Sequence, residues 1–144
     1  MDVPEEAYTI PIGKAKVVRE GVDVTIVSWG PPVLIAKQVA EEVEKKGISV
    51  EVIDLRTVQP IDIDTIIASV EKTSRLIVVH EAVKSAGVGG EIAALVSEYG
   101  LFSLAAPILR VTGYDTPYPV PSIEDDWLPT VPRLINAIDH VMQF

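Results

Sequence analysis

The sequence predicts a single α/β domain: a three-layer α/β/α sandwich whose five-stranded, mostly parallel sheet has one antiparallel strand. Three observations lead to this prediction. Short runs rich in Val and Ile alternate with amphipathic stretches of helical length. The 144 residues suffice for one domain with a substantial core. The run Leu76 to Val79, preceded by Arg75, is apolar and β-branched, as expected for a strand covered on both faces.

The first elements are expected to form a hairpin. Residues 8–12 are extended and Gly13 interrupts them. Residues 14–19 alternate between charged and apolar side chains, as in a half-exposed strand, and residues 22–29 form a second strand. Because only the turn Glu20-Gly21 separates the two strands, we expect them to pair with each other in antiparallel orientation.

The rest of the chain alternates helices and strands. Residues 33–46 carry an apolar stripe opposite charged side chains and end at Gly47, which indicates a helix. A second helix begins at Asp62 or Asp64 and runs to Lys72, a third covers residues 91–99, and Thr130 caps the last. The other elements are strands at 49–55 and 108–111 and a proline-rich loop at 112–126. The second helix is expected to bury the apolar residues Ile63, Ile66, Ile67 and Val70. This order implies right-handed crossovers and helices on both faces of the sheet.

Composition excludes several classes of partner and site. The chain has 12 Lys and Arg against 21 Asp and Glu, a net charge of −9. Nucleic acids and anionic membranes are therefore poor partners, whereas a basic protein would be attracted. There are no cysteines, which excludes disulfides, thiolate metal sites and a cysteine nucleophile. No apolar run is long enough to span a bilayer, and the acidic N-terminus does not resemble a signal peptide.

The glycine-rich turn Gly87-Val-Gly-Gly90 and the pair His80-Glu81 are the first candidates for chemistry. The turn lies between a strand and a helix, but its spacing matches no phosphate-binding motif, and Glu91 would repel an anion there. We expect a structural turn. His80 could act as a general base. Neighbours on a strand point to opposite faces, however, so we favour a hydrogen-bonded histidine in a loop or an interface between subunits.

Arg56, Trp127 and Phe144 are candidates for contacts. Arg56 follows a strand and could bind an anion or a partner carboxylate, but a salt bridge to Asp54 or Asp115 is the favoured expectation. Trp127 and the terminal Phe144 are candidate interface residues, since a terminal Phe offers a partner one apolar and one anionic contact. An equally weighted alternative is a Phe folded onto its own domain. On residues alone, the chain is predicted to be an interaction or assembly domain without a complete active site.

Several motifs occur together in one order along the chain. They are VIDLRTVQPIDIDTI (52–66), SVEKTSR (69–75), HEA (80–82), GGEIA (89–93), APILRV (106–111), GYDTP (113–117) and the LP at 128–129. Together they closely resemble the C-terminal domain of the β subunit of thiamine-diphosphate-dependent 2-oxo acid dehydrogenases, the E1 component.

This resemblance implies a transketolase C-terminal-like domain at residues 14–144, with residues 1–13 as a linker from an N-terminal domain that the sequence lacks. It implies an α2β2 enzyme that oxidatively decarboxylates a 2-oxo acid and transfers the acyl group to lipoyl groups of E2. Its partners would be the E1 α subunit, a second β subunit and the E2 subunit-binding domain. Thiamine diphosphate and Mg²⁺ would bind outside this chain, which is expected to be inactive alone. No site for a cofactor or metal, and no catalytic residue, is expected within it.

The resemblance also suggests how E2 docks. In the family, the small basic E2 domain is bound by the carboxylate at the C-terminus of the β chain, here that of Phe144, and by an acidic residue before the Ala-Pro, here Ala105. We therefore expect weaker docking, or docking through other carboxylates such as Glu98. His-Glu-Ala and Gly-Tyr-Asp-Thr-Pro resemble branched-chain enzymes, whereas the segment around Trp127 resembles pyruvate dehydrogenases, so the 2-oxo acid stays open.

A bacterial protein of this kind would be cytoplasmic, and a full-length eukaryotic precursor could be sent to the mitochondrial matrix.

The competing hypothesis for function is a stand-alone α/β regulatory or small-ligand-binding module that uses the crevice at Gly87–Gly90.

Overall fold

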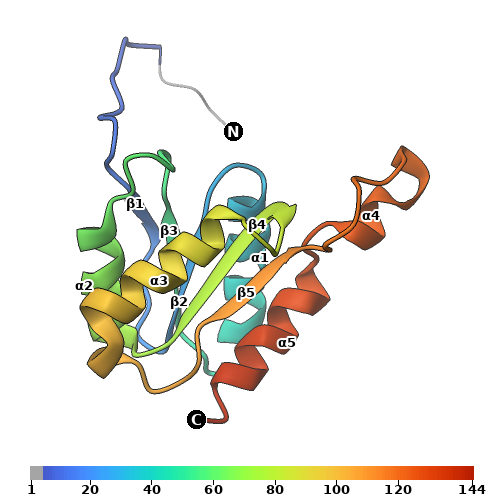
Figure 1. The fold of residues 1–144 in the computed structure, drawn as a ribbon. Coiled ribbons are helices and arrows are strands. Elements are labelled where there is room, and N and C mark those ends of the chain that lie inside the picture. The colour runs from blue at the N-terminus through green and yellow to red at the C-terminus, as the bar shows by residue number, and fades with distance from the viewer. Residues whose placement is uncertain (1–4) are drawn as a thin grey trace.

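A computed structural model describes residues 5–144 of the chain (Figure 1). Its elements follow the predicted alternation of strands and helices. They are β1 (Lys16–Arg19), β2 (Val24–Ser28), α1 (Pro32–Glu44), β3 (Val50–Asp54), α2 (Ile63–Thr73), β4 (Leu76–Val83), α3 (Val88–Gly100), β5 (Leu109–Gly113), α4 (Glu124–Trp127) and α5 (Val131–Val141), with short 3₁₀ turns at Leu101–Ser103 and Pro121–Ile123.

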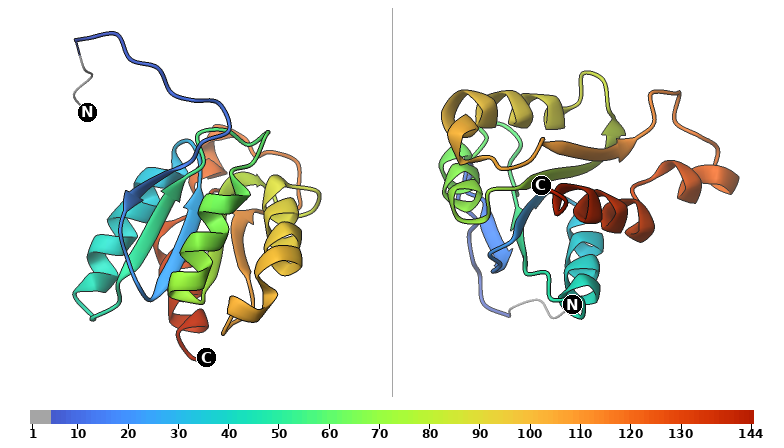
Figure 2. Two further views of the ribbon diagram at one scale, coloured as in Figure 1. Left: turned by 90° about the vertical axis from the view of Figure 1, so that its left-hand side faces the viewer. Right: turned by 90° about the horizontal axis from the view of Figure 1, so that it is seen from below.

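The five strands form one sheet in the order β1-β3-β2-β4-β5. Within residues 5–144, only β1 runs antiparallel to its neighbour, and all other neighbouring pairs are parallel. Helices α1 and α5 cover one face of the sheet, and α2 and α3 cover the other (Figure 2). The predicted three-layer sandwich with one antiparallel strand is confirmed.

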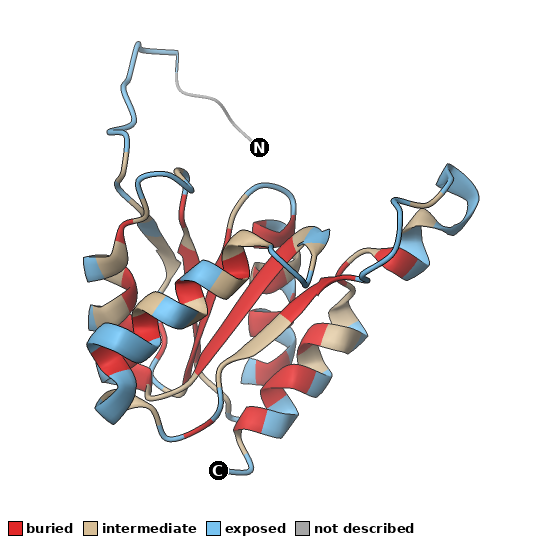
Figure 3. Ribbon diagram, in the orientation of Figure 1, coloured by how far each residue is buried: buried red, intermediate tan, exposed pale blue. Residues whose placement is uncertain are grey.

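The inner strand β4, which lies between β2 and the edge strand β5, contributes to the hydrophobic cores on both faces of the sheet (Figure 3). Ile77 and Val79 pack toward α1 and α5, whereas Leu76 and Val78 pack toward α2 and α3, and all four are fully buried. Fully burying a Val, Leu or Ile side chain contributes about 1.5–3 kcal/mol. The apolar run is therefore covered on both faces as predicted, but the middle strand of the sheet is β2 and not β4.

The predicted N-terminal hairpin is wrong. β1 pairs with β3, in a register that places Lys16 opposite Asp54, so β3 lies between β1 and β2. The chain does turn at Gly21, but it then crosses the start of β3 instead of folding back on β1. A Cβ at Gly21 would lie 2.2 Å from the backbone nitrogen of Glu51, so only glycine permits this crossing. The fully buried β2 thus gains parallel neighbours on both sides.

Smaller differences concern the ends of elements. β4 extends to Val83, α3 begins three residues earlier than expected, and the predicted loop 112–126 contains most of α4. Thr130 caps α5 as predicted, because its Oγ1 accepts a hydrogen bond from the Arg133 backbone nitrogen at 3.4 Å. Residues 5–13 of the predicted linker belong to no helix or strand, and residues 1–4 lie outside the described part of the chain. The domain boundary itself stays a prediction.

Candidate functional site

His80 lies in β4 on the face covered by α3, and its side chain is only 1% exposed. Its ring stacks on Trp29 with the two ring centroids 5.3 Å apart. On the other side lies the first turn of α3, where a Cβ at Gly89 would sit 2.5 Å from Nε2 and one at Gly87 would sit 2.8 Å from Cε1. The glycine-rich turn is therefore a structural cradle for the imidazole, as expected of a helix-entry turn.

The imidazole of His80 is buried without a hydrogen-bond partner on either ring nitrogen. The expected hydrogen bond is absent among residues 5–144, and a place for His80 at an interface between subunits stays a prediction. Burial lowers the pKa of His80, because it penalises the charged imidazolium. The backbone of Ala82 opposes this shift, and the nearby Arg110 charge adds to it. A neutral ring closed off from solvent has no path to a substrate proton, so we assign it a packing role. Because the imidazole fills the crevice at Gly87 and Gly89, the alternative of a ligand module there loses its site.

Glu81 and Arg56 lie at the same carboxyl edge of the sheet but do not meet His80. Glu81 follows His80 and faces the opposite side, where it lines a small hollow with Pro32 and Leu128. Arg56 is exposed, and its backbone nitrogen donates to Asp54 Oδ1 at 3.1 Å. Among residues 5–144 its guanidinium makes no ion pair, and Asp115 instead accepts from Ser85, so the expected salt bridge is wrong.

Trp127 is buried inside the domain, with 7% of its surface exposed. Its Nε1 donates to Thr116 Oγ1 at 3.0 Å, and its ring meets that of Tyr118 edge to face at 4.9 Å. Arg133 donates to the backbone oxygen of Trp127. These contacts fold the proline-rich segment back on α4 and α5. A direct contact of Trp127 with another chain stays a prediction, and its burial favours a role in shaping the segment around it.

Phe144 lies at the opposite, amino edge of the sheet, together with position 105. The Ala105 nitrogen donates to the Ser74 carbonyl at 2.8 Å, and Arg75 Nε donates to the Val141 carbonyl at 3.0 Å. The residues just before β4 therefore tie both the entry to β5 and the end of α5 to one edge. Phe144 is 60% exposed, and its ring meets His140 edge to face at 5.7 Å. Phe144 thus touches its own domain and still leaves much of its ring exposed, and its contact with a partner stays a prediction.

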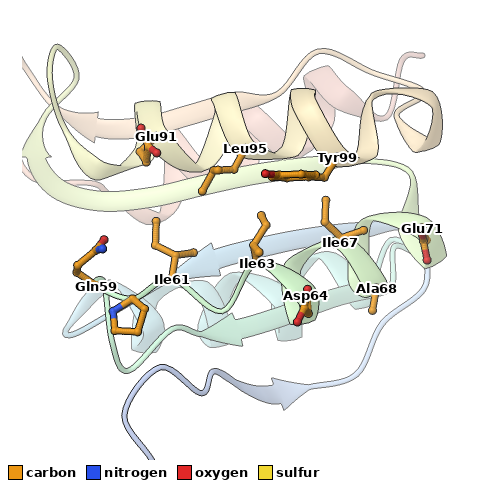
Figure 4. Close-up of a pocket in the computed structure, with 11 residues that line it drawn as sticks. Gln59, Ile61, Ile63, Asp64, Ile67, Ala68, Glu71, Glu91, Leu95 and Tyr99 are labelled. Atoms are coloured by element: carbon orange, nitrogen blue, oxygen red, sulfur yellow. The ribbon is translucent and has the colours of Figure 1, made fainter.

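A groove of about 600 Å³ runs between α2 and α3 (Figure 4). Its floor is apolar, with Ile63 and Ile67 on α2 facing Leu95 and Tyr99 on α3. Three carboxylates, Asp64, Glu71 and Glu91, lie along the groove. The lining of the groove contains no Lys or Arg. An apolar floor with an acidic rim suits a protein segment that carries apolar and basic side chains together.

Sequence reasoning missed this groove. Ile63 and Ile67 were predicted to be buried like Ile66, but both are only half-buried. The sequence does contain one indication of the groove, which is the width of the apolar face of this helix. Three isoleucines within five positions make that face wider than the stripe that one packed helix needs. Glu98, the other predicted contact residue, is exposed on α3 and does not line the groove. Its docking role stays a prediction.

None of the helices within residues 5–144 has the length and apolar character needed to cross a membrane.

Comparison with known proteins matches residues 13–134 to the family model of the transketolase C-terminal domain. The chain is 53% identical over 143 residues to proteins of Staphylococcus epidermidis and Staphylococcus aureus, each named "Pyruvate dehydrogenase E1 component subunit beta". These alignments cover 99% of this chain but only 44% of each relative. The chain thus spans less than half the length of the curated relatives that it matches.

A solved structure described as "Split gene transketolase, inactive beta4 tetramer" has the same fold. The two superpose with a TM-score of 0.85 over 99% of this chain and 46% of the other. Sequence identity is 24%, so this likeness supports the fold alone.

Proposed function

Because the chain belongs to the transketolase C-terminal domain family, we propose that it is the assembly and docking domain of an E1 β subunit. The full enzyme would be a 2-oxo acid dehydrogenase that oxidatively decarboxylates its substrate and transfers the acyl group to E2. Two relatives that are 53% identical to this chain are named as pyruvate dehydrogenase subunits, and this name supports pyruvate as the substrate. Their bacterial origin supports a cytoplasmic location.

Thiamine diphosphate, the cofactor implied by this proposal, does not fit the described residues. The one glycine-rich helix entry within residues 5–144 is closed by His80, and the α2–α3 groove presents carboxylates that would repel a diphosphate. No group of three or more potential metal ligands lies together in this part of the chain to hold Mg²⁺. We therefore assign the cofactor to other parts of the full enzyme, and we expect the 144-residue chain to lack decarboxylase activity. Cofactor-dependent decarboxylation by this chain would contradict the proposal.

The observation that carries the docking role is the shared edge of Phe144 and Ala105. Hydrogen bonds from Ala105 to Ser74 and from Arg75 to Val141 bring both positions to the amino edge of the sheet. The family resemblance points to these same two positions for binding the basic E2 domain. The net charge of −9 favours such a partner electrostatically. We propose that the terminal carboxylate and the exposed Phe144 ring form the contact.

The test is a calorimetric titration of a cognate E2 subunit-binding domain into the 144-residue chain. Removal of Phe144 is expected to weaken binding about tenfold or more, as for an interface hot spot. Leu34→Ala serves as a control because Leu34 is an apolar residue of α1 that is 57% exposed. Equal affinity of the full-length and shortened chains would rule out the C-terminal anchor.

The α2–α3 groove supports a second contact within the same assembly. We propose that it binds a segment of the E1 α subunit in which apolar side chains are flanked by Lys or Arg, since the groove offers the complementary surface. Ile67→Glu is expected to weaken binding of purified E1 α by about tenfold. Leu34→Glu introduces the same charge on the opposite helix layer and is expected to have no effect. Equal loss in both variants would contradict this assignment.

A further inference from the structure

Three cationic side chains meet at the carboxyl ends of β4 and β5. Lys84 directly follows β4, Arg110 lies on β5, and Arg133 comes from the first turn of α5. Together they line a pocket of about 220 Å³, here called the arginine pocket. The complete lining is Lys84, Arg110, Thr112, Gly113, Tyr114, Asp115 and Arg133. In an open α/β sheet, the carboxyl ends of the strands are where ligands bind.

Carboxylates match the charges of these three cations only in part. Among residues 5–144 none of the five ion pairs includes Lys84, Arg110 or Arg133. The pocket has one carboxylate, Asp115, whose two oxygens each accept a hydrogen bond from Ser85 at 2.8 Å. Three cations against one carboxylate give the lining a net charge of +2. This local excess stands out in a chain whose net charge is −9.

The arginines are held in place by neutral groups. Arg133 donates to the carbonyl oxygens of Thr112, Trp127 and Leu128, and its guanidinium lies 4.6 Å from the centre of the Tyr114 ring. Arg110 Nη1 donates to the Lys84 carbonyl at 3.0 Å. Carbonyl oxygens orient a guanidinium without cancelling its formal charge. The positions of both side chains are thus fixed before any ligand arrives, which lowers the entropic cost of binding.

Enough donors remain for a ligand. A guanidinium has about five N–H donors, and Arg110 uses one of them in the hydrogen bond to Lys84. Lys84 is exposed, and its ammonium makes no hydrogen bond within residues 5–144. A guanidinium fork and an ammonium group can each donate to the oxygens of a carboxylate or phosphate. A volume of about 220 Å³ lies below the roughly 300–1,000 Å³ of drug-sized ligand sites, so one small anionic group fits best.

We propose that the arginine pocket binds a single oxyanion group, a carboxylate or a phosphate, with Arg110 and Lys84 donating to its oxygens and Arg133 adding favourable charge. The group could belong to a free small anion or to an acidic side chain of a bound protein. This inference does not depend on the proposed role in an E1 enzyme, because it rests only on the charges and donors of this chain.

The test is an NMR titration of the isotope-labelled 144-residue chain at constant ionic strength, with chloride replaced by inorganic phosphate in one arm. A short acidic peptide is added in the other arm. Saturable shifts of the backbone amides of residues 84–86 and 110–115 are expected in at least one arm. Saturation by phosphate identifies a free-anion site, and saturation by the peptide alone identifies a site for a partner carboxylate.

Variants make the test specific. Arg110→Gln and Lys84→Gln are each expected to weaken binding by about tenfold, as for the loss of a charge-assisted hydrogen bond. Arg56→Gln is the matched control: it removes one exposed, unpaired arginine at the same edge of the sheet and should change the affinity less than about twofold. The proposal is overturned if neither probe produces saturable shifts, or if Arg110→Gln and Arg56→Gln have equal effects.

Discussion

The backbone of Gly89 lies directly against the imidazole of His80, so that a Cβ at position 89 would meet Nε2 at 2.5 Å and Cδ2 at 2.8 Å. The histidine is buried in the inner strand β4, and the glycine lies in the first turn of the helix that covers it. Neither group can move aside easily, because Trp29 stacks on the other side of the ring. The contact therefore fixes how closely α3 approaches the sheet.

Gly89→Ala is expected to destabilise the fold by about 1–3 kcal/mol, the usual cost of overpacking a core. The measurement is urea unfolding monitored by circular dichroism. Gly90→Ala is the control, because its Cβ would meet only the flexible end of Arg110 at 3.4 Å. Alanine is the better helix former by up to about 1 kcal/mol, so Gly90→Ala should be neutral or stabilising. Similar losses in both variants would show that His80 is not the obstacle.

The lowered pKa of His80 predicts that stability falls in mildly acidic solution. Above the unfolded-state pKa of about 6.5, His80 is neutral in both states and its burial costs no proton. As the pH falls below that value, His80 becomes protonated in the unfolded chain but stays neutral in the folded chain, because its folded-state pKa is lower. The unfolded state is stabilised by this proton until the pH reaches the folded-state pKa. Stability is thus fully present above about pH 6.5 and is lost below it.

The measurement compares urea unfolding at about pH 7.5 and about pH 5.5 in the native chain and in His80→Leu. The native chain should lose stability between the two pH values, and each unit of pKa shift accounts for about 1.4 kcal/mol. His80→Leu should lose most of this dependence, whereas His140→Gln, a change at an exposed residue of α5, should keep it. An unchanged pH dependence in His80→Leu would assign the effect to other groups.

The alternation of elements was predictable because each helix and strand is specified locally, by periods of 3.6 and 2 in its apolar residues. The position of β1 was not, because it depends on a close approach between Gly21 and Glu51 that no local pattern records. The α2–α3 groove depends on how far α3 lies from Ile67, a distance between helices that are remote in sequence. The burial of Trp127 depends on a segment whose prolines suppress any periodicity.

The arginine pocket escaped prediction for a related reason. Lys84, Arg110 and Arg133 are spread over 50 positions of the sequence, and only the parallel pairing of β4 with β5 and the return of α5 bring them together. Arg56, which did stand out in the sequence at a strand end, does not line this pocket. Charge clustering in α/β folds is thus a property of strand order, which local patterns do not determine.

Lys72 is predicted to stabilise the fold, because it neutralises the buried Glu51. Glu51 is 1% exposed and accepts hydrogen bonds from Lys72 Nζ and Ser69 Oγ, and from the Gly21 nitrogen at 3.3 Å. Lys72→Met would leave that carboxylate unpaired. Because the Lys72 side chain is 39% exposed, water would partly replace it, and we expect a loss of roughly 2 kcal/mol instead of the roughly 3–5 kcal/mol typical of a fully buried pair.

A double-mutant cycle with Glu51→Gln tests this prediction by urea unfolding. The double variant should be more stable than the sum of the two single losses implies, because removing both charges leaves no unpaired carboxylate. Strictly additive losses would contradict a direct coupling between Lys72 and Glu51.

Ala105→Glu is predicted to strengthen binding of a basic E2 subunit-binding domain, if the chain docks it as proposed. The Ala105 side chain is exposed and only its backbone nitrogen is engaged, so the substitution should change stability by less than about 0.5 kcal/mol. An added carboxylate at the edge of an interface contributes about 0.2–1 kcal/mol, which corresponds to a gain in affinity of up to about fivefold. Calorimetric titration at low and high salt measures it, and the gain should shrink as salt screens the charge. Ala105→Gln controls for size without charge. Equal gains in affinity from Glu and Gln, or a gain that salt does not reduce, would show that position 105 does not act as an acidic anchor. The terminal carboxylate of Phe144 would then be the electrostatic contact at this edge.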